Sequence, residues 1–255
     1  MDRRLALVRR PSPHLADGLV THIERQPVDL ELAARQWEAY VEALRGAGWD
    51  VVEAPAAPDL PDSAFVEDTA VVYGDLAVIT RPGALERRPE PDAVEPVLRD
   101  LGYRVARIEE PGTLDGGDVL KHGGTVWVGL GGRTNRAGFE QLAAHLAGLA
   151  DDVIPVPLSL VLHLKSAVTA LPDGTVVGFP EVVDDPAVYP EFLEVPEEHG
   201  GHVVLLGDDR LLMSTSAPRT AALFRDRGYQ VITVDISEYE KLEGCVTCLS
   251  VRLRG

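Results

Sequence analysis

The two cysteines near the carboxyl end of the sequence are the residues with the clearest chemical potential. Cys245 and Cys248 are the only cysteines among 255 residues, and they stand three positions apart. Two cysteines so close together cannot cross-link a fold of this size, so their interest is chemical. Their spacing invites a zinc or redox site, but no second pair exists to complete a four-ligand zinc site. An inert buried thiol is the other interpretation, and partner residues must decide between the two.

The segment that carries these cysteines, residues 244–253, predicts a final β-strand. Its residues alternate between a mostly apolar set and a more polar set, and several of them are β-branched. In a strand, Cys245 would face the apolar side and Cys248 the opposite, more polar side. The two sulfurs would then point apart, which argues against a shared zinc or redox site. We therefore expect Cys248 to be the candidate nucleophile and Cys245 to be structural.

A cysteine nucleophile needs a histidine that manages its protons, and His163 is the candidate for that role. It lies in the aliphatic run 161–166, which predicts a strand. A lone histidine in such a run is more often a hydrogen-bonded core residue, and the chain contains six other histidines. Cysteine hydrolases nevertheless recruit a histidine from far along the chain, and His163 is the one best placed on an ordered element.

An acidic cluster ahead of an apolar strand could bind a planar cation. Asp62, Glu67 and Asp68 lie close together in the sequence, and Phe65 stands among them. Their ordinary interpretation is a solvated strand entrance. The functional one is a guanidinium site, since paired carboxylates match the fork of donors that a guanidinium presents. An aromatic ring such as that of Phe65 could cover the flat face of the cation.

A second acidic pair, Asp115 and Asp118, flanks two glycines. Hairpin turn chemistry explains such a sequence without any function. The segment also resembles part of a calcium loop, but the ligand spacing and the closing glutamate of that loop are missing. The pair is therefore informative only in combination with other residues.

The elements that must position these residues recur along the chain. Strands that end in polar turns are predicted at 5–8, 76–79, 126–128, 176–179 and 211–213. A helix is predicted after Asp29, which is a good capping residue. A glycine, an aromatic residue, a polar residue and a valine open the strands that begin at Gly48, Gly102 and Gly228.

This repeat has a period of roughly fifty residues, which is typical of propellers and solenoids. Five mixed α/β units that close into a ring would make a single domain over residues 1–255. An ordinary open α/β sandwich is the alternative architecture.

The charge of the chain favours small cationic ligands over nucleic acid. Its 24 Lys and Arg against 41 Asp and Glu give a net charge of -17. Such a charge opposes binding to phosphate backbones and to anionic membranes. No apolar run is long enough to span a bilayer, and the stretch after residues 1–4 is too short for a signal peptide. We expect a cytoplasmic location.

Taken together, these segments resemble the dimethylarginine dimethylaminohydrolases, members of a guanidine-modifying superfamily that includes arginine deiminases and amidinotransferases. The resemblance covers nearly the whole chain, and six stretches in the right order carry it: 60–68, 79–84, 112–120, 133–135, 162–166 and 244–250. It implies a five-bladed α/β propeller with the substrate at its centre. It implies neither cofactor nor metal, although zinc could bind Cys248 and His163 as an inhibitor.

The resemblance also implies a role for each candidate residue. Cys248 would be the nucleophile and His163 the general acid and base, while Asp68 and Asp115 would face the guanidinium. Relatives also carry glutamate at the position of Asp115, which leaves open whether this carboxylate reaches His163 or the substrate. Glu67 would support the guanidinium site. The remaining candidates would bind the amino-acid end of the substrate: Asp62, the backbones of Leu19 and Leu242, and the side chains of Arg87, or its neighbour Arg88, and Arg133.

The implied reaction is hydrolysis of asymmetric dimethylarginine or monomethylarginine to citrulline and an amine through an S-alkylthiouronium on Cys248. Arginine deiminase activity on unmethylated arginine is one alternative, although those enzymes generally carry an extra helical domain. Non-catalytic binding of a cationic amino acid is another, and the presence of both Cys248 and His163 argues against it. The sequence leaves open the preferred methylated form and the oligomeric state, including a homodimer.

Overall fold

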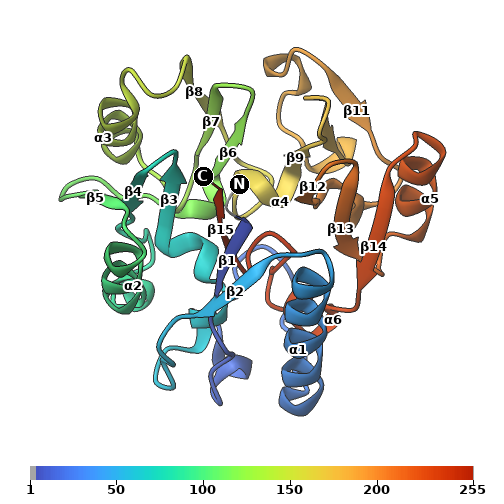
Figure 1. Cartoon of the computed structure of the whole chain (residues 1–255), viewed down its shortest axis with the longest axis horizontal. Helices are drawn as coiled ribbons and strands as arrows, with labels where there is room; N and C mark the ends of the chain where they lie inside the picture. Colours follow the sequence, from blue (N-terminus) through green and yellow to red (C-terminus); the bar gives the residue numbers. More distant parts are fainter. Residues whose placement is uncertain (1–3, 255) are drawn as a thin grey trace.

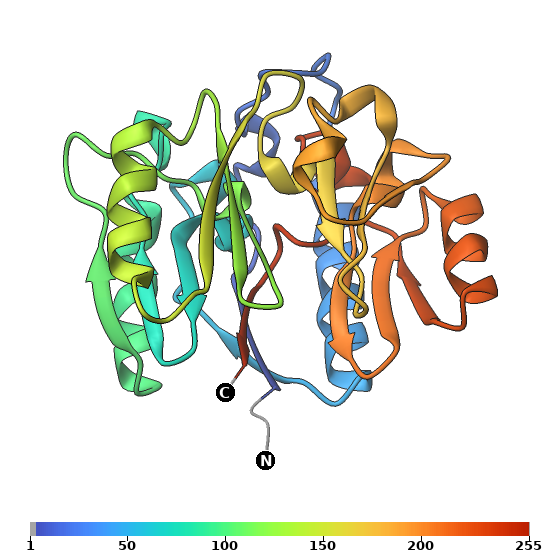
Figure 2. The same ribbon diagram turned by 90° about the horizontal axis from the view of Figure 1, so that it is seen from above.

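The chain folds into five three-stranded units arranged around a common centre (Figure 1). The structure, a computed structural model, describes residues 4–254. The sheets stand upright around the axis, and the longer helices lie on the outside of the ring (Figure 2). This arrangement confirms the predicted five-bladed α/β propeller, and the open sandwich alternative is wrong.

Each sheet follows the same plan, in which one strand pair is antiparallel and the next pair is parallel. In the order in which neighbouring strands pair, the sheets are β15 (Val251–Arg254), β1 (Arg4–Val8) and β2 (Asp50–Glu53); β3 (Ala70–Tyr73), β4 (Leu76–Ile79) and β5 (Arg104–Arg107); β6 (Val119–His122), β7 (Thr125–Leu130) and β8 (Asp152–Pro157); β9 (Val168–Ala170), β10 (Val176–Gly178) and β11 (Phe192–Glu194); and β12 (Val204–Gly207), β13 (Arg210–Ser214) and β14 (Gln230–Val234). The repeat predicted from the sequence is therefore a repeat of topology.

A helix connects the two parallel strands in four of the five units. These helices are α1 (Leu30–Gly46), α2 (Val94–Asp100), α3 (Arg136–Leu146) and α5 (Pro218–Asp226). Parallel strands need such a crossover because the chain leaves one strand at its carboxyl end and must return to the opposite end to begin the next. The fourth unit, β9 to β11, uses two 3-10 turns instead, at Pro180–Val182 and Pro186–Val188.

The α1 helix shows how local sequence sets these boundaries. The Asp29 carboxylate accepts a hydrogen bond from the backbone N–H of Leu32 at 2.9 Å and so caps the first turn. Gly48, Gly102 and Gly228 each follow a helix with φ between 82° and 95°. Glycine adopts this left-handed conformation without a steric penalty, so the chain can turn back into the parallel strand. The glycine signature in the sequence therefore marks the return to each outer strand.

The ring closes between the two ends of the described chain. Strand β1 pairs antiparallel with β15, and Leu5 lies opposite Leu253. The first and last strands therefore complete one sheet, on which β2 forms the outer edge. Figure 2 shows the first strand, in blue, beside the last strand, in dark red, near the axis. None of the helices in residues 4–254 is long and apolar enough to span a bilayer.

The prediction of a strand over residues 244–253 is wrong for most of its length. Strand β15 begins only at Val251, and the residues before it form consecutive turns. The backbone N–H of Cys248 donates to the carbonyl of Cys245 at 3.1 Å, which closes a tight turn. The Cys248 carbonyl in turn accepts from the N–H of Glu67 at 3.1 Å. Cys248 therefore bonds to the backbone of Glu67 and not to a neighbouring strand.

The strand predicted over residues 161–166 is also absent. His163 is the extended residue just before the short helix α4 (Leu164–Ala167). The glycines after Asp115 form the 3-10 turn η6 (Gly116–Asp118) instead of a hairpin. Local apolar character misled the prediction of a strand, because the residues around His163 are buried by the ring around them.

Candidate active site

Segments that are far apart in the sequence line a pocket at the centre of the ring. The predicted residues that line it are Leu19, Asp62, Phe65, Asp68, Arg87, Arg133, His163, Leu242 and Cys248. Three residues that the sequence did not indicate also line it, namely Leu162, Glu243 and Gly244. Two predicted residues, Asp115 and Glu67, lie behind the wall of this pocket. The structure therefore brings most of the candidate residues together.

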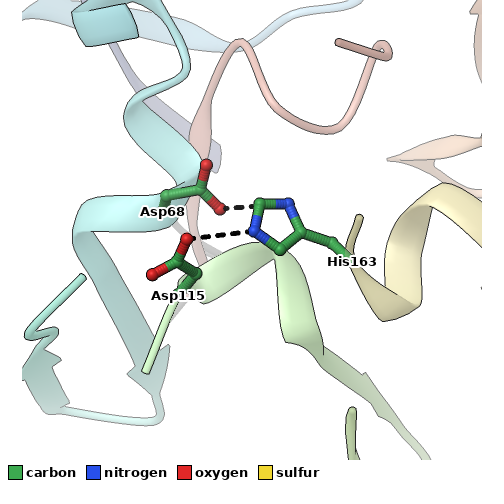
Figure 3. A group of neighbouring side chains, drawn as sticks. All are labelled: Asp68, Asp115 and His163. Atoms are coloured by element: carbon green, nitrogen blue, oxygen red, sulfur yellow. Dashed lines mark hydrogen bonds and ion pairs between the residues drawn. The ribbon is translucent and has the colours of Figure 1, made fainter. Parts of the chain in front are cut away.

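The imidazole of His163 lies between two carboxylates (Figure 3). Its Nε2 is 3.0 Å from Asp115 Oδ2, and its Nδ1 is 3.8 Å from Asp68 Oδ1. Burial by itself lowers the pKa of His163, but the charges of Asp68 and Asp118 and the hydrogen bond to Asp115 outweigh burial and raise it to about 9. His163 is therefore a protonated donor at neutral pH.

Asp115 acts on the imidazole from outside the pocket. Burial opposes its ionisation, but the hydrogen bond and charge of His163 overcome that effect and lower the pKa of Asp115. Its Oδ1 accepts from the N–H of Gly83 at 2.9 Å, and its own N–H donates to Thr134 Oγ1 at 3.1 Å. The carboxylate thus reaches His163 and lies outside the pocket wall, which answers the question left open by the sequence.

The glycines beside Asp115 allow the close packing of this group. A Cβ atom on Gly117 would lie 2.6 Å from His163 Nδ1 and 2.7 Å from Asp68 Oδ1. The Gly117 N–H donates to Asp68 Oδ1 at 2.8 Å. A Cβ on Gly116 would lie 2.0 Å from the carbonyl oxygen of Glu67. The glycine pair is needed because neighbouring backbone and side chains approach too closely for any other residue.

Asp118 holds the histidine segment in place. Its carboxyl oxygens accept from the N–H of Leu164 at 3.0 Å and from Thr134 Oγ1 at 2.6 Å. Burial raises the pKa of Asp118 to about 7, although the charge of His163 opposes that shift. Because Leu164 directly follows His163, this bond fixes the backbone that carries the imidazole.

Arg87 binds two carboxylates within the protein. Its guanidinium donates to Asp68 Oδ2 at 2.7 Å and to Glu90 Oε2 at 2.7 Å, and it is almost fully buried. Its neighbour Arg88 instead donates to the Pro82 carbonyl and does not line the pocket. Of the two adjacent arginines, Arg87 is the one that reaches the candidate site.

Phe65 is positioned by tight packing around its ring. The ring meets Tyr239 edge-on, with centroids 6.1 Å apart. A Cβ on Gly244 would lie 2.4 Å from Phe65 Cε1, so only glycine lets the cysteine-bearing segment pass this ring. The packing leaves Phe65 in the pocket lining, where the sequence placed it.

Two carboxylates tie a covering loop, residues 18–23, to the pocket. The backbone N–H of Leu19 donates to both oxygens of Asp62, at 3.1 and 3.2 Å. On the other side, the Glu243 carboxylate accepts from the N–H groups of Thr21, at 3.0 Å, and Ile23, at 3.2 Å, and from that of the intervening residue. Glu243 has φ 61°, a strained value for a residue with a side chain. Its only signal in the sequence was an acid before a glycine.

Glu67 faces away from the candidate pocket. It lines a second cavity of about 550 Å³, and its Oε1 is 2.7 Å from Lys165 Nζ and 2.6 Å from an Arg252 nitrogen. Burial works against the charge of Glu67, but these two cations lower its pKa. Its N–H holds the Cys248 carbonyl, so Glu67 can support the site from behind.

The two sulfur atoms converge, which corrects the expectation that they point apart. Cys245 Sγ and Cys248 Sγ are 3.3 Å from each other, because a turn places residues three apart on the same side. Cys248 lines the pocket and Cys245 lies behind it. The hydrogen bond with Cys245, burial and nearby negative charges raise the pKa of Cys248 well above its usual range. Cys248 is thus a thiol at neutral pH.

Asp68, Asp115 and His163 also offer ligand atoms within 4.8 Å of one another. Each of the three is already engaged within the protein, and a protonated imidazole has no free lone pair for a metal. This geometry suits an acid–base group better than a metal centre. That no cofactor takes part stays a prediction.

Comparison with known proteins gives this geometry a context. The arginine deiminase family model matches residues 50–200. The N(G),N(G)-dimethylarginine dimethylaminohydrolase of Streptomyces coelicolor is 61% identical over 254 residues, covering 100% of this chain and 98% of the relative. The enzyme of that name from Pseudomonas aeruginosa is 37% identical, covering 96% of this chain and 98% of its own.

Solved structures agree with these matches. A crystal structure of a dimethylarginine dimethylaminohydrolase adduct with S-methyl-L-thiocitrulline has a TM-score of 0.91 at 34% identity, covering 99% of this chain and 100% of the other. A mutant of the Pseudomonas aeruginosa enzyme complexed with citrulline has the same TM-score and identity, covering 98% and 99%. The amino-terminal domain of a cyanobacterial arginine dihydrolase shares the fold, with a TM-score of 0.85 at 20% identity, covering 98% and 97%.

Proposed function

The chain belongs to the dimethylarginine dimethylaminohydrolase family, and on that premise we propose that it hydrolyses N-methylated arginine to citrulline and dimethylamine or methylamine. The observation that carries the proposal is the shared pocket of Cys248, His163 and Asp68. These residues are a nucleophile, a proton donor and an anchor for a cation. Solved relatives bound to citrulline and to a thiocitrulline derivative support the same substrate class.

Substrate recognition follows from the distribution of charge around the pocket. Asp68 would pair with the guanidinium, and the ring of Phe65 would lie against its flat face. At the other end, Asp62 would bind the α-ammonium group while Arg133 binds the carboxylate. A pocket lined by both acidic and basic side chains suits an amino acid whose side chain carries a guanidinium.

Further groups would bind the α-ammonium and carboxylate end of the substrate. Leu19 and Leu242 line the pocket, and their backbone carbonyls would accept hydrogen bonds there. Arg87, held between protein carboxylates, would contribute positive charge toward the substrate carboxylate. Holding both ends fixes the central guanidinium carbon near sulfur and removes translational and rotational freedom before the reaction.

Substrate binding would activate the nucleophile. Before substrate binds, the raised pKa keeps Cys248 protonated. A guanidinium cation placed beside the sulfur favours the thiolate and lowers that pKa. The thiolate then attacks the guanidinium carbon and forms a tetrahedral intermediate.

His163 would manage the protons of both halves of the reaction. As an imidazolium it gives its proton to the departing dimethylamine or methylamine, which leaves an S-alkylthiouronium on Cys248. The neutral imidazole then removes a proton from water, which attacks the same carbon. Citrulline leaves and the thiolate is restored. Asp115 keeps the ring oriented and stabilises its charged form.

The test is to incubate the purified chain separately with asymmetric dimethylarginine, monomethylarginine and arginine, and to measure citrulline. We expect release from the methylated forms and little from arginine, with Cys248→Ser as the inactive control. Faster release from arginine would favour a deiminase, which the arginine deiminase family match makes the second candidate. No citrulline from any of the three would leave a binding protein.

A further inference from the structure

The two cysteines form a close pair at the edge of the pocket. Their sulfurs are 3.3 Å apart, and both are free thiols. Thr247 Oγ1 lies 3.2 Å from Cys245 Sγ and fixes that sulfur from a second direction. No role in the proposed hydrolysis requires this second thiol. Its position next to the proposed nucleophile therefore suggests a role outside the hydrolysis.

The backbone already holds the geometry that a bridge between them requires. Cys248 N–H donates to the Cys245 carbonyl at 3.1 Å, which is the bond of a four-residue turn. The first and last Cα atoms of such a turn lie within about 7 Å. A disulfide spans Cα separations of about 4.4–6.8 Å. The sulfurs can therefore join with small side-chain rotations.

We propose that Cys245 and Cys248 are an oxidation site at which a small peroxide converts the pair into a reversible intrachain disulfide. Cys248 lines the pocket and is the sulfur that a small oxidant can reach. Cys245, which is 2% exposed and lies behind it, is the sulfur that closes the bridge. The loss of activity that follows rests on the proposed role of Cys248 as nucleophile.

The reaction balances with hydrogen peroxide as the oxidant. Cys248 passes its proton to Cys245, and the thiolate attacks one peroxide oxygen, so that the O–O bond breaks and hydroxide leaves. Cys245 then attacks the resulting sulfenic sulfur. The S–S bond forms, the S–O bond breaks, and the hydroxyl leaves with the proton of Cys245 as water. The pair loses two electrons and the peroxide gains them.

The environment of the pair supports this order of events. The hydrogen bond from Cys248 lowers the pKa of Cys245 to about 5, although burial opposes this shift. At neutral pH the negative charge of the pair therefore lies on Cys245, which can accept the proton of Cys248, and thiolates are the species that peroxides oxidise. A bound substrate would cover Cys248 and slow its oxidation. An external thiol would attack the bridge and restore both cysteines.

The test is to treat the purified wild-type chain with hydrogen peroxide and to map its tryptic peptides without reduction. Cleavage after Lys241 and Arg252 yields one peptide that contains both cysteines. We expect this peptide to lose two hydrogen atoms and citrulline release to fall, with both changes reversed by dithiothreitol. Bound citrulline should slow the mass change.

Cys245→Ser is the matched variant, because it keeps a small polar group beside Cys248 but cannot form the bridge. We expect it to retain turnover before treatment and, after treatment, to gain oxygen atoms on Cys248 instead of losing hydrogen. Oxygen added to Cys248 in the wild-type chain, with Cys245 still free, would overturn the proposal. The mass change is read independently of activity, so failure of the hydrolase assignment would leave this test intact.

Discussion

The charge of the imidazole of His163 decides when the candidate site can work. Its carboxylate neighbours raise its pKa to about 9, so it stays protonated over the neutral range in which a leaving amine needs a proton. A histidine near its usual pKa would be mostly neutral at pH 7.5. The buried carboxylates thus keep His163 protonated at neutral pH, so that it can act as a general acid.

Asp115→Asn should shift the pH dependence of turnover. The amide removes the negative charge beside Nε2, so the pKa of His163 falls. The wild-type rate should decline as pH rises through about 9, and the decline should begin at lower pH in the variant. Steady-state kcat against pH measures this, with the circular dichroism spectrum as the control for folding. An unchanged basic limb would show that Asp115 does not set the charge of His163.

The two cysteines should respond unequally to substitution. Cys248→Ser removes the proposed nucleophile from the pocket, so citrulline release should fall to background. Cys245→Ser leaves the lining of the pocket intact and should retain most turnover under reducing conditions. Equal losses in the two variants, with both folded, would show that the pocket position does not identify the nucleophile.

At the residue scale, the sequence identified the chemistry better than the geometry. The types of the acids, the histidine and the cysteine suggested possible chemistry, and the family resemblance predicted which of them meet. They could not show that Asp115 reaches His163 from behind or that the sulfurs touch. Those details depend on close approaches at Gly117 and on a turn at 245–248, which alternation of residue types cannot reveal.

Among the elements, the loop over the pocket is held by Asp62 at Leu19 and by Glu243 at residues 21–23. Three consecutive backbone N–H groups of residues 21–23 donate to the Glu243 carboxylate. Hydrogen bonds to a charged acceptor are stronger than neutral ones. Since Leu242 and Gly244 line the same pocket, Glu243 couples the covering loop to the wall beside the nucleophile.

Glu243→Gly should loosen this loop without harming the fold. Glycine accepts the φ of 61° without strain, while the acceptor for the loop is lost. We expect KM to rise on the order of tenfold, a change of about 1.4 kcal/mol in binding, and trypsin to cut faster after Arg25. Glu24→Gly, an exposed site in the neighbouring segment, is the matched control. Equal protease sensitivity in the two variants would exclude the role of Glu243.

Burial explains which strands could be predicted from the sequence and which predictions were wrong. The strands predicted from apolar runs that end in polar turns, β1, β4, β7, β10 and β13, are the middle strands of their sheets. Middle strands are buried on both faces and read as continuous apolar runs. Outer strands such as β2 and β5 have polar, exposed ends, so the glycine signature before them was their signal in the sequence. Segments at the axis, including 161–166, are buried by other units and therefore look like strands.

In the whole molecule, the sheet of β15, β1 and β2 joins the two ends of the described chain. We propose that the chain is a single cooperative domain, because β15 must pair with β1 before the last unit is complete. Leu253 is fully buried in this sheet and packs in one cluster with residues of the next unit, such as Ile79 and Leu98. Interactions at this seam should therefore stabilise every unit.

Leu253→Ala should lower the free energy of unfolding by about 2–5 kcal/mol, the usual cost of a cavity in a packed core. Leu85→Ala removes the same atoms from a side chain that is 66% exposed and should change stability by less than about 0.5 kcal/mol. Urea unfolding followed by tryptophan fluorescence and by circular dichroism measures both. Separate transitions for the two signals would contradict a single domain.

The most direct test of the central claim is to trap the covalent intermediate. His163→Gly removes the base that activates water, and turnover should fall on the order of 10²–10⁴-fold. Mixed with a methylated arginine and analysed by mass spectrometry, this variant should carry an alkylthiouronium on Cys248 and on no other residue. Wild-type rates of citrulline release from the variant, with no adduct at Cys248, would contradict the account.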